Sequence, residues 1–160
     1  MTAQSICVMG LGYIGLPTSS LLATKGFQVR GVDVSAHVVD IINQGSIHIV
    51  EPDLDVLVRA AVSSGNLVAS LEPAPADVFI IAVPTPFSEG HVPDLSYVDS
   101  ATDALAPHVA AGNLVILEST SPPGTTERVA ARLWSQRPEL EGLVRVAHCP
   151  ERVLPGHILR

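Results

Sequence analysis

The sequence predicts an α/β fold in which helices cover both faces of a six-stranded, mostly parallel sheet. Short apolar runs alternate with amphipathic stretches six times along the 160 residues, and the links between them are short. Strands that are separated by helices pair in parallel through right-handed crossovers, which favours a doubly wound sheet. In addition, a turn with three glycines directly follows the first apolar run, which indicates a ligand-binding version of such a fold.

Each expected element follows from the local pattern of residues. We expect strands near residues 5–9, 27–32, 67–69, 77–83, 113–117 and 143–147. We expect helices near residues 13–24, 36–42, 54–61, 96–105 and 125–134. Ser35 and Asp53 are candidate N-caps, and Gly26 and Gly45 are candidate helix ends. Residues 77–83 are apolar on both faces, as expected for a strand buried between two helical layers.

The composition excludes several classes of protein. Hydrophobic residues make up 47% of the chain and charged residues 16%, which argues against disorder. A net charge of −7 and a single lysine, Lys25, argue against a nucleic-acid or membrane-surface partner. Residues 1–5 lack the basic region of a signal peptide, and no apolar run approaches the length of a bilayer. We therefore expect a cytoplasmic protein with reduced thiols.

The cysteines and histidines do not predict a metal site. Cys7 lies inside an apolar strand and is expected in the core. Cys149 lies nearer the functional edge of the sheet, but the sequence places no identifiable base or cation beside it. None of the six histidines is spaced from another histidine or a cysteine as metal ligands are, and the neighbours His148 and Cys149 cannot easily share one tetrahedral ion. We interpret the histidines as solvated or strand-edge residues.

The glycine turn has the spacing G-x-G-x-x-G, with Gly10, Gly12 and Gly15 between a strand and a helix. Gly10 would allow the chain to turn sharply, and Gly12 would allow a pyrophosphate to approach the backbone. Gly15 would allow close packing of helix and strand, while the helix N-terminus offers N–H groups to phosphates. The spacing is typical of the dinucleotide-binding turn of a Rossmann fold, but by itself it is a weak signal because it also occurs in ordinary turns.

Asp33 supports the dinucleotide interpretation. It ends the second expected strand, 23 residues after Gly10 by sequence number (33 − 10). A carboxylate there can accept hydrogen bonds from both ribose hydroxyls of an adenosine, and it would repel a 2′-phosphate. Val34 and Ser35 supply no cation for such a phosphate, so the sequence favours NAD over NADP. The alternative is that Asp33 only caps a helix.

Further candidates follow the later strands, at the edge where their carboxyl ends meet. Thr85 follows the fourth strand, Glu118-Ser119-Thr120 follows the fifth, and Glu151 follows the sixth. In a doubly wound sheet the ligand crosses this edge, so Thr85 could bind the cofactor and Glu151 could act as a base or orient water. Thr125–Thr126 begins a helix that faces the same edge. The alternatives are a surface hydroxyl for Thr85, helix capping for Thr125–Thr126, and a surface glutamate for Glu151.

Five stretches in this order resemble one family, the UDP-glucose/GDP-mannose dehydrogenases, in its N-terminal NAD-binding domain. They span the chain from end to end: Gly10-Leu11-Gly12-Tyr13-Ile14-Gly15-Leu16-Pro17, Ile47-His48-Ile49-Val50-Glu51-Pro52-Asp53-Leu54, Val83-Pro84-Thr85-Pro86-Phe87, Leu117-Glu118-Ser119-Thr120-Ser121-Pro122 and Cys149-Pro150-Glu151-Arg152-Val153-Leu154-Pro155-Gly156. Glu-Pro-Asp-Leu and Pro-Glu-Arg-Val-Leu-Pro-Gly resemble the branch that acts on UDP-N-acetyl-D-mannosamine.

The resemblance implies a two-step oxidation of the C6 alcohol of a UDP-sugar to a carboxylate, with two NAD reduced. In the family a cysteine forms a thiohemiacetal and then a thioester, which water hydrolyses. Carried onto this chain, the resemblance assigns NAD contacts to five residues, Tyr13, Ile14, Asp33, Thr85 and Thr126. It implies that Thr120 helps to hold the catalytic water, that Glu151 serves the acid–base steps, and that Arg152 and Val153 lie against the sugar nucleotide.

The resemblance covers only part of the family's machinery. Its nucleophilic cysteine, with lysine and asparagine partners, lies in later segments, as do the central helix and the UDP-binding domain. Cys149 precedes the Pro-Glu-Arg stretch and does not match that nucleophile. We therefore expect residues 1–160 to form the NAD-binding domain of a homodimeric enzyme and to be inactive alone. The alternatives are a dehydrogenase for UDP-glucose or UDP-N-acetylglucosamine, and a non-catalytic nucleotide-binding module.

Overall fold

The computed structural model describes residues 4–87, 92–152 and 156, and the predicted α/β class is confirmed. The six strands are β1 (Ser5–Met9), β2 (Gln28–Val32), β3 (Leu67–Ser70), β4 (Val78–Ile81), β5 (Leu114–Leu117) and β6 (Arg145–His148). The helices are α1 (Gly15–Thr24), α2 (Ala36–Asn43), α3 (Leu54–Ser63), α4 (Ser96–Leu105) and α5 (Thr125–Gln136), with 3-10 turns at Ala106–His108 and Pro138–Leu140.

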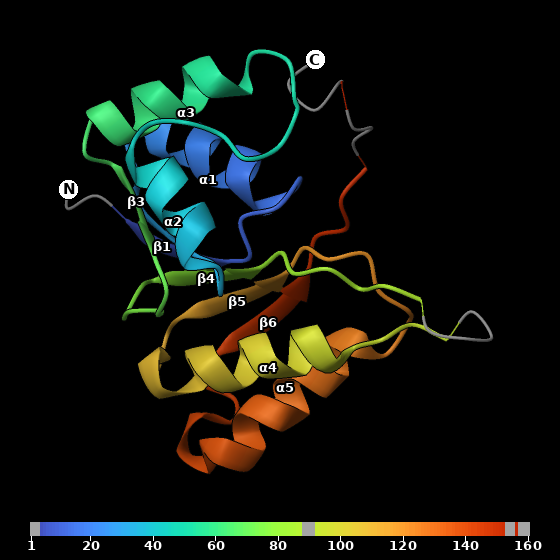
Figure 1. Cartoon of the computed structure of the whole chain (residues 1–160). Helices are drawn as coiled ribbons and strands as arrows, with labels where there is room; N and C mark the ends of the chain where they lie inside the picture. Colours follow the sequence, from blue (N-terminus) through green and yellow to red (C-terminus); the bar gives the residue numbers. More distant parts are fainter. Residues whose placement is uncertain (1–3, 88–91, 153–155, 157–160) are drawn as a thin grey trace.

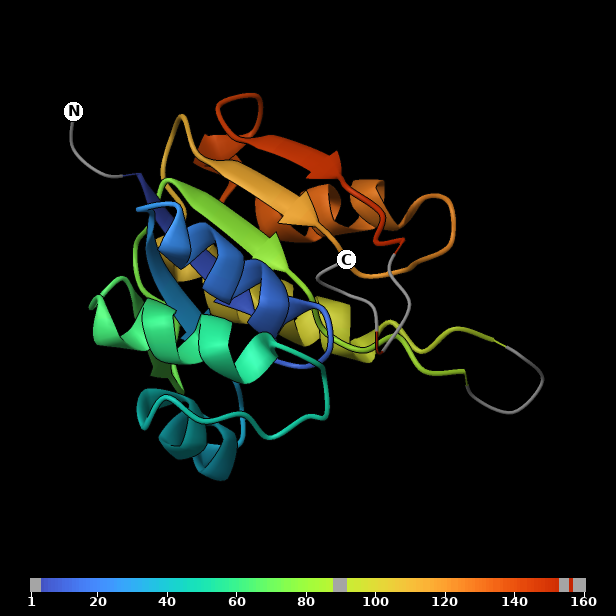
Figure 2. The ribbon, with the colours of Figure 1, turned by 90° about the horizontal axis from the view of Figure 1, so that it is seen from above.

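The sheet has the order β3-β2-β1-β4-β5-β6, and every neighbouring pair is parallel. The chain builds outward from β1 to β3, returns to place β4 beside β1, and then builds outward in the other direction. The strand order therefore reverses between β1 and β4, where a doubly wound sheet opens a crevice at its carboxyl edge. In Figure 2 the arrows of β4, β5 and β6 point in the same direction, towards this edge.

Helices α1, α2 and α3 cover one face of the sheet, and α4 and α5 cover the other (Figure 1). Alternate side chains of each strand serve the two resulting core layers. In β1, Val8 packs towards α1 and α3, whereas Cys7 and Met9 pack towards α4 and α5. Cys7 is fully buried, as predicted, and burial raises the pKa of its thiol, which makes it an unreactive core residue.

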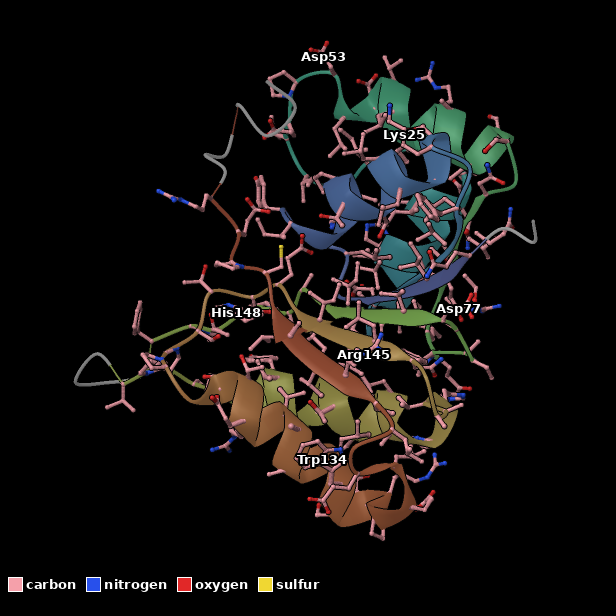
Figure 3. The ribbon with its side chains drawn as sticks, turned by 180° about the vertical axis from the view of Figure 1, so that it is seen from behind. Lys25, Asp53, Asp77, Trp134, Arg145 and His148 are labelled. Atoms are coloured by element: carbon pink, nitrogen blue, oxygen red, sulfur yellow. The ribbon has the colours of Figure 1, made fainter. Side chains whose placement is uncertain are left out.

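The amino ends of β1 and β4 are tied together by Asp77, which Figure 3 labels at the end of the sheet opposite to the crevice. Its Oδ2 accepts hydrogen bonds from the Ser5 backbone N–H and from Ser5 Oγ, both at 2.8 Å. These bonds hold the pKa of the Asp77 carboxyl below its usual range. The two strands that flank the crevice are thus fixed in register at the far end.

Of three local predictions, two need correction and one is confirmed. Asp53 precedes α3 as expected, but its φ is 64° and its side chain makes no capping hydrogen bond. Ser35 does cap α2, since its Oγ accepts from the Val38 N–H at 3.4 Å. The sixth strand begins at Arg145 rather than at residue 143, because residues 141–144 close the turn after the last 3-10 segment and place Val144 in the core.

None of the helices in the described ranges has the length and apolar character needed to cross a bilayer.

Candidate functional site

The glycine turn follows β1 at the carboxyl edge of the sheet, and two of its three glycines are required because backbone atoms lie too close for a side chain. Gly10 has a φ of 94°, and a Cβ on it would lie 2.7 Å from the Ala82 carbonyl oxygen. A Cβ on Gly15 would lie 1.8 Å from the Gly10 carbonyl oxygen. By contrast, no described atom lies within 4 Å of a Cβ built on Gly12. The turn is therefore tightly packed at Gly10 and Gly15, whereas the space next to Gly12 is open, so a phosphate can approach the backbone there.

Asp33 is anchored to this turn by the chain's own backbone. Its Oδ2 accepts from the Leu11 N–H at 3.1 Å, and its Oδ1 accepts from the Ser35 N–H at 3.0 Å. The carboxylate is half-buried and keeps further lone pairs for a ligand. Because Ser35 is the cap of α2, the alternative interpretation of Asp33 as that cap is wrong.

An apolar pocket of about 300 Å³ lies beside Asp33 and was not predicted from the sequence. It is formed where the chain leaves β1 to β4 and by one face of α4. Its lining residues are Met9, Gly10, Val32, Asp33, Val34, Leu71, Pro73, Val83, Pro84, Tyr97, Ser100, Ala101 and Ala104. An apolar slot next to a carboxylate suits a planar base attached to a ribose. The only signal in the sequence was a set of apolar residues directly after strands, at Val34, Leu71 and Val83.

The loops after β4 and β5 are fixed to one another. Thr85 Oγ1 donates to the Thr120 carbonyl oxygen at 2.5 Å, and Ser119 Oγ donates to the Val83 carbonyl oxygen at 2.7 Å. Thr120 is itself exposed at the edge. The structure therefore brings Thr85 and Thr120 together, as predicted from the topology, although the Thr85 hydroxyl donates to the protein and not outward.

Glu118 lies between the end of β5 and the first turn of α1. Its Oε1 accepts from Thr18 Oγ1 at 3.1 Å, while its Oε2 is buried and has no hydrogen-bond partner among the described residues. Burial raises the pKa of the Glu118 carboxyl to about 7, and the negative charge of Glu151 adds to this effect, while the Thr18 hydrogen bond opposes it. Two predicted site residues, Glu118 and Glu151, are therefore electrostatic neighbours.

Gly156, which follows β6 in the sequence, is hydrogen-bonded to a buried glutamate in the loop of residues 44–53. Glu51 is 4% exposed, and its Oε2 accepts from the Gly156 N–H at 2.6 Å. The Arg152 N–H donates to Glu151 Oε1 at 2.5 Å, and the Arg152 side chain is exposed. Glu51 belongs to one of the five family-like stretches, and nothing in its sequence context predicted this contact. Val153 lies outside the described residues.

The remaining predicted NAD contacts are less well defined by the structure. Tyr13 is 44% exposed at the glycine turn, and Ile14 is partly buried against the core. Thr126 is half-buried in the first turn of α5 and lines a different hollow, between α5 and β6, with Trp134 and Val146. Thr125 is buried, and its Oγ1 donates to the Pro122 carbonyl oxygen at 2.7 Å. For Thr126 an NAD contact stays a prediction.

One histidine is not the solvated residue that the sequence suggested. His48 has a buried Nδ1 without a hydrogen-bond partner in the described part of the chain, and burial lowers the pKa of its imidazole. The charge of Asp33 opposes that shift, so His48 lies near the carboxylate of the site. Within the described ranges, no three His, Cys, Asp or Glu side chains are grouped so that they could hold a metal ion.

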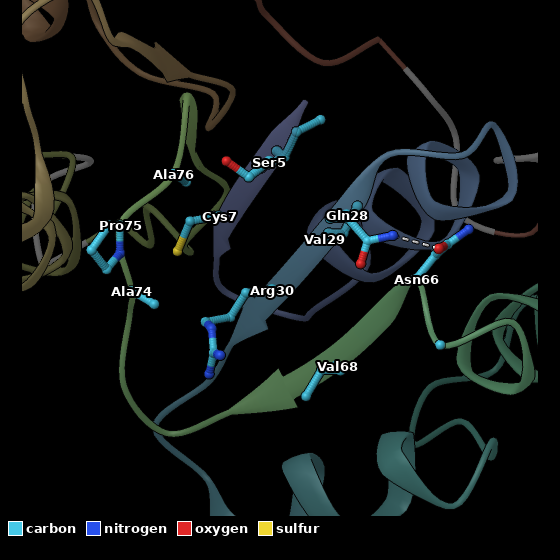
Figure 4. Close-up of a pocket in the computed structure, with 12 residues that line it drawn as sticks. Ser5, Cys7, Gln28, Val29, Arg30, Asn66, Val68, Ala74, Pro75 and Ala76 are labelled. Carbon is cyan, nitrogen blue, oxygen red and sulfur yellow. Dashed lines mark hydrogen bonds between the residues drawn. The ribbon is translucent and has the colours of Figure 1, made fainter. Parts of the chain in front are cut away.

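A further hollow, of about 210 Å³, lies at the amino ends of β1, β2 and β3 (Figure 4). Ser5, Arg30 and Asn66 line it, and Gln28 Nε2 donates to Asn66 Oδ1 at 2.7 Å across its rim. Since it opens at the end of the strands opposite to the glycine turn, it is separate from the crevice.

The profile described as the UDP-glucose/GDP-mannose dehydrogenase family, NAD binding domain, matches residues 4–160. The chain belongs to this family. The glycine turn, Asp33 and the apolar slot are therefore parts of an NAD-binding domain, and the predicted cofactor is confirmed. The predicted resemblance is confirmed as well.

Among curated relatives, an NDP-N-acetyl-D-galactosaminuronic acid dehydrogenase of Ralstonia nicotianae is 59% identical, covering 98% of this chain and 39% of that protein. The UDP-N-acetyl-D-mannosamine dehydrogenase of Escherichia coli K12 is 52% identical, covering 99% of this chain and 40% of that protein. A solved UDP-D-ManNAc dehydrogenase from Pyrococcus horikoshii is 44% identical with a TM-score of 0.89, covering 96% of this chain and 38% of that one. The chain thus spans about two fifths of the length of these relatives.

Proposed function

We propose that the chain supplies the NAD-binding part of an enzyme that oxidises the C6 alcohol of a UDP-N-acetylhexosamine, with UDP-N-acetyl-D-mannosamine as the first candidate. The observation that carries this proposal is the arrangement of polar groups along the carboxyl edge of the sheet, where the strand order reverses. At one end Asp33, the glycine turn and the apolar slot can take an adenosine diphosphate. At the other end two glutamates and two threonines stand where the reacting half of NAD would extend.

We call these two ends the adenosine half (Gly10–Gly15, Asp33 and the apolar slot) and the nicotinamide half (Thr85, Glu118, Thr120 and Glu151). In the adenosine half, Asp33 would hold the ribose hydroxyls, and the N-terminus of α1 would face the pyrophosphate. Bound NAD supplies a hydride acceptor. In the nicotinamide half, Thr120 would orient water, and the carboxylate of Glu151 would take a proton from it, while Arg152 would pair with an anionic group of the sugar nucleotide.

The nucleophile of the proposed reaction is expected from the remainder of the full protein. Cys7 is fully buried in β1, and Cys149 follows β6 before the Pro-Glu-Arg stretch. We therefore propose that the 160-residue chain binds NAD and does not turn over a UDP-sugar. Any NADH formation by this chain alone would contradict the proposal.

A second candidate substrate is favoured by one comparison. The Ralstonia relative, whose name specifies an N-acetyl-D-galactosaminuronic acid, is 59% identical to this chain over the aligned residues, compared with 52% for the Escherichia coli UDP-N-acetyl-D-mannosamine dehydrogenase. The alternative is therefore a UDP-sugar of the galacto configuration. In both cases the same crevice would serve, because this chain supplies the cofactor side of the site.

Calorimetric titration of the chain with NAD+ and with NADP+ tests the cofactor part of the proposal. We expect NAD+ to bind and NADP+ to bind at least about tenfold more weakly, because Asp33 would repel a 2′-phosphate. For the substrate, the full-length protein is assayed for NADH with UDP-N-acetyl-D-mannosamine, UDP-N-acetyl-D-galactosamine, UDP-N-acetylglucosamine and UDP-glucose. Formation of two NADH per sugar identifies the substrate, and failure with all four would reject the proposed activity.

A further inference from the structure

The Glu118 carboxyl group differs from that of Asp33 because one of its two oxygens is left without a partner among the described residues. Thr18 satisfies Oε1, but Oε2 is buried and receives no hydrogen bond from the described residues. A buried carboxylate oxygen without a donor is costly, whereas a protonated carboxyl group avoids much of that cost. The free chain therefore favours the neutral form of Glu118.

The position of Glu118 connects it to the cofactor. Thr18 lies in the first turn of α1, directly after the glycine turn, so its hydrogen bond places the carboxyl group next to the predicted pyrophosphate site. Glu118 also directly follows β5, on the β4 side of the switch point and opposite to Asp33. With the adenosine beside Asp33, a dinucleotide that crosses the edge brings its nicotinamide ring to the side of Glu118. This step rests on the proposed function.

We propose that Glu118 gives up a proton to solvent when the positively charged nicotinamide of NAD+ binds, and that it keeps this proton when the neutral ring of NADH binds. The step is an acid dissociation: the Glu118 O–H bond breaks, the carboxylate remains, and the proton enters solvent. Glu118 would thus make the chain distinguish the two oxidation states of its cofactor by their charge, in a pH-dependent manner.

The direction of the effect follows from linkage. The pKa of Glu118 in the free chain is raised to about 7, so the carboxyl is largely protonated at pH 6 and largely ionised at pH 8. A nearby positive charge favours the ionised form and lowers this pKa. NAD+ affinity should then rise about five- to tenfold from pH 6 to pH 8, with release of about half a proton per NAD+ at pH 7. NADH affinity should lack this rise.

Other titratable groups lie close enough to be considered. Glu151 acts on Glu118 as a like charge, and Thr18 contributes a hydrogen bond but no charge. Asp33, His48 and His37 influence one another at the other end of the crevice. NAD+ and NADH carry the same adenosine diphosphate. Any protons that Asp33, His48 or His37 bind or release therefore cancel when the two cofactors are compared.

The test is isothermal titration calorimetry of the 160-residue chain with NAD+ and NADH at pH 6, 7 and 8. At pH 7, two buffers of different ionisation enthalpy report the number of protons released. We expect release with NAD+ that exceeds release with NADH, and that disappears in Glu118→Gln, which keeps the size of the side chain but cannot ionise. Equal release with both cofactors, or undiminished release in Glu118→Gln, would overturn the inference.

Two further variants should shift the pH at which NAD+ affinity rises, without abolishing the rise. Thr18→Val removes a hydrogen bond that favours the ionised form, so the rise in NAD+ affinity should move to higher pH. Glu151→Gln removes a like charge, so the rise should move to lower pH. Midpoints that stay in place in both variants would contradict the assignment. If neither cofactor binds at all, the proposed function fails as well, whereas binding without proton release refutes this inference alone.

Discussion

The two halves of the crevice differ in how far the chain satisfies its own polar groups. In the adenosine half, both oxygens of Asp33 accept backbone hydrogen bonds, and an apolar slot is already formed beside them. In the nicotinamide half, one oxygen of Glu118 is buried without a partner in the described chain, and Thr120 and Arg152 are exposed. The first half is organised before any ligand arrives. The second half is arranged for groups that the ligand and the rest of the protein bring.

The largest expected effect concerns the contact on which the adenosine half is built. Gly15→Ala places a Cβ 1.8 Å from the Gly10 carbonyl oxygen, so the turn must open. We expect a loss of about 3 kcal/mol or more in the free energy of unfolding, measured by urea denaturation. Gly12→Ala is the matched control, because its Cβ meets no described atom within 4 Å. It should unfold like the parent chain and bind NAD+ about tenfold more weakly. Equal stability losses in both variants would contradict the geometry of the turn.

The next largest effect is expected at Asp33. Asp33→Ala removes a charged acceptor for the ribose and the two backbone contacts of the carboxylate. NAD+ binding should weaken by about 1–3 kcal/mol in calorimetry. Asp33→Asn keeps the size and part of the hydrogen bonding but loses the charge, so it should lose less affinity for NAD+ and discriminate less against NADP+. An unchanged affinity in Asp33→Ala would show that the carboxylate serves only the turn.

In the nicotinamide half, Glu118 should make stability depend on pH. Its pKa is about 7 in the folded chain, above that of an unfolded glutamate, so the folded state binds more protons between pH 4.5 and 7. The contribution of Glu118 to the free energy of unfolding is therefore largest below this range, and it falls as the pH rises through 7. Relative to the parent chain, Glu118→Gln should gain about 1–2 kcal/mol between pH 5 and pH 8, less than the full shift implies because solvent reaches part of the side chain. Urea denaturation at several pH values measures this, and a constant difference would reject it.

The smallest effect is expected at Thr85. Thr85→Val removes the hydrogen bond to the Thr120 carbonyl oxygen, which lies near the surface. The free energy of unfolding should fall by about 1 kcal/mol or less. NAD+ affinity should fall more than stability if the Thr85 hydroxyl also accepts a hydrogen bond from the cofactor. Thr85→Ser, which keeps the hydroxyl, should restore both quantities, and a failure to do so would point to packing of the methyl group instead.

The same two halves differ in how well they could be predicted from sequence. The glycine turn and Asp33 are close in sequence and follow strands, so topology alone fixes where they meet. The apolar slot depends on Leu71 and Tyr97, which belong to separate elements, and no local pattern joins them. The contact of Glu51 with Gly156 joins residues 105 positions apart. The prediction for Asp53 was wrong because aspartate is a common capping residue. In the structure Asp53 has a φ of 64°, and its side chain makes no capping hydrogen bond.

The contact between Glu51 and Gly156 has a consequence for exchanging parts between relatives. Glu151 and Arg152 follow β6, and a few residues later the Gly156 N–H donates to Glu51, which is buried in the loop before α3. A chimera that takes the segment after β6 from one relative and loop 44–53 from another would pair a donor and an acceptor from different proteins at this contact. Segments distant in sequence should therefore be transplanted as a pair, and the natural crossover points for recombination lie outside both.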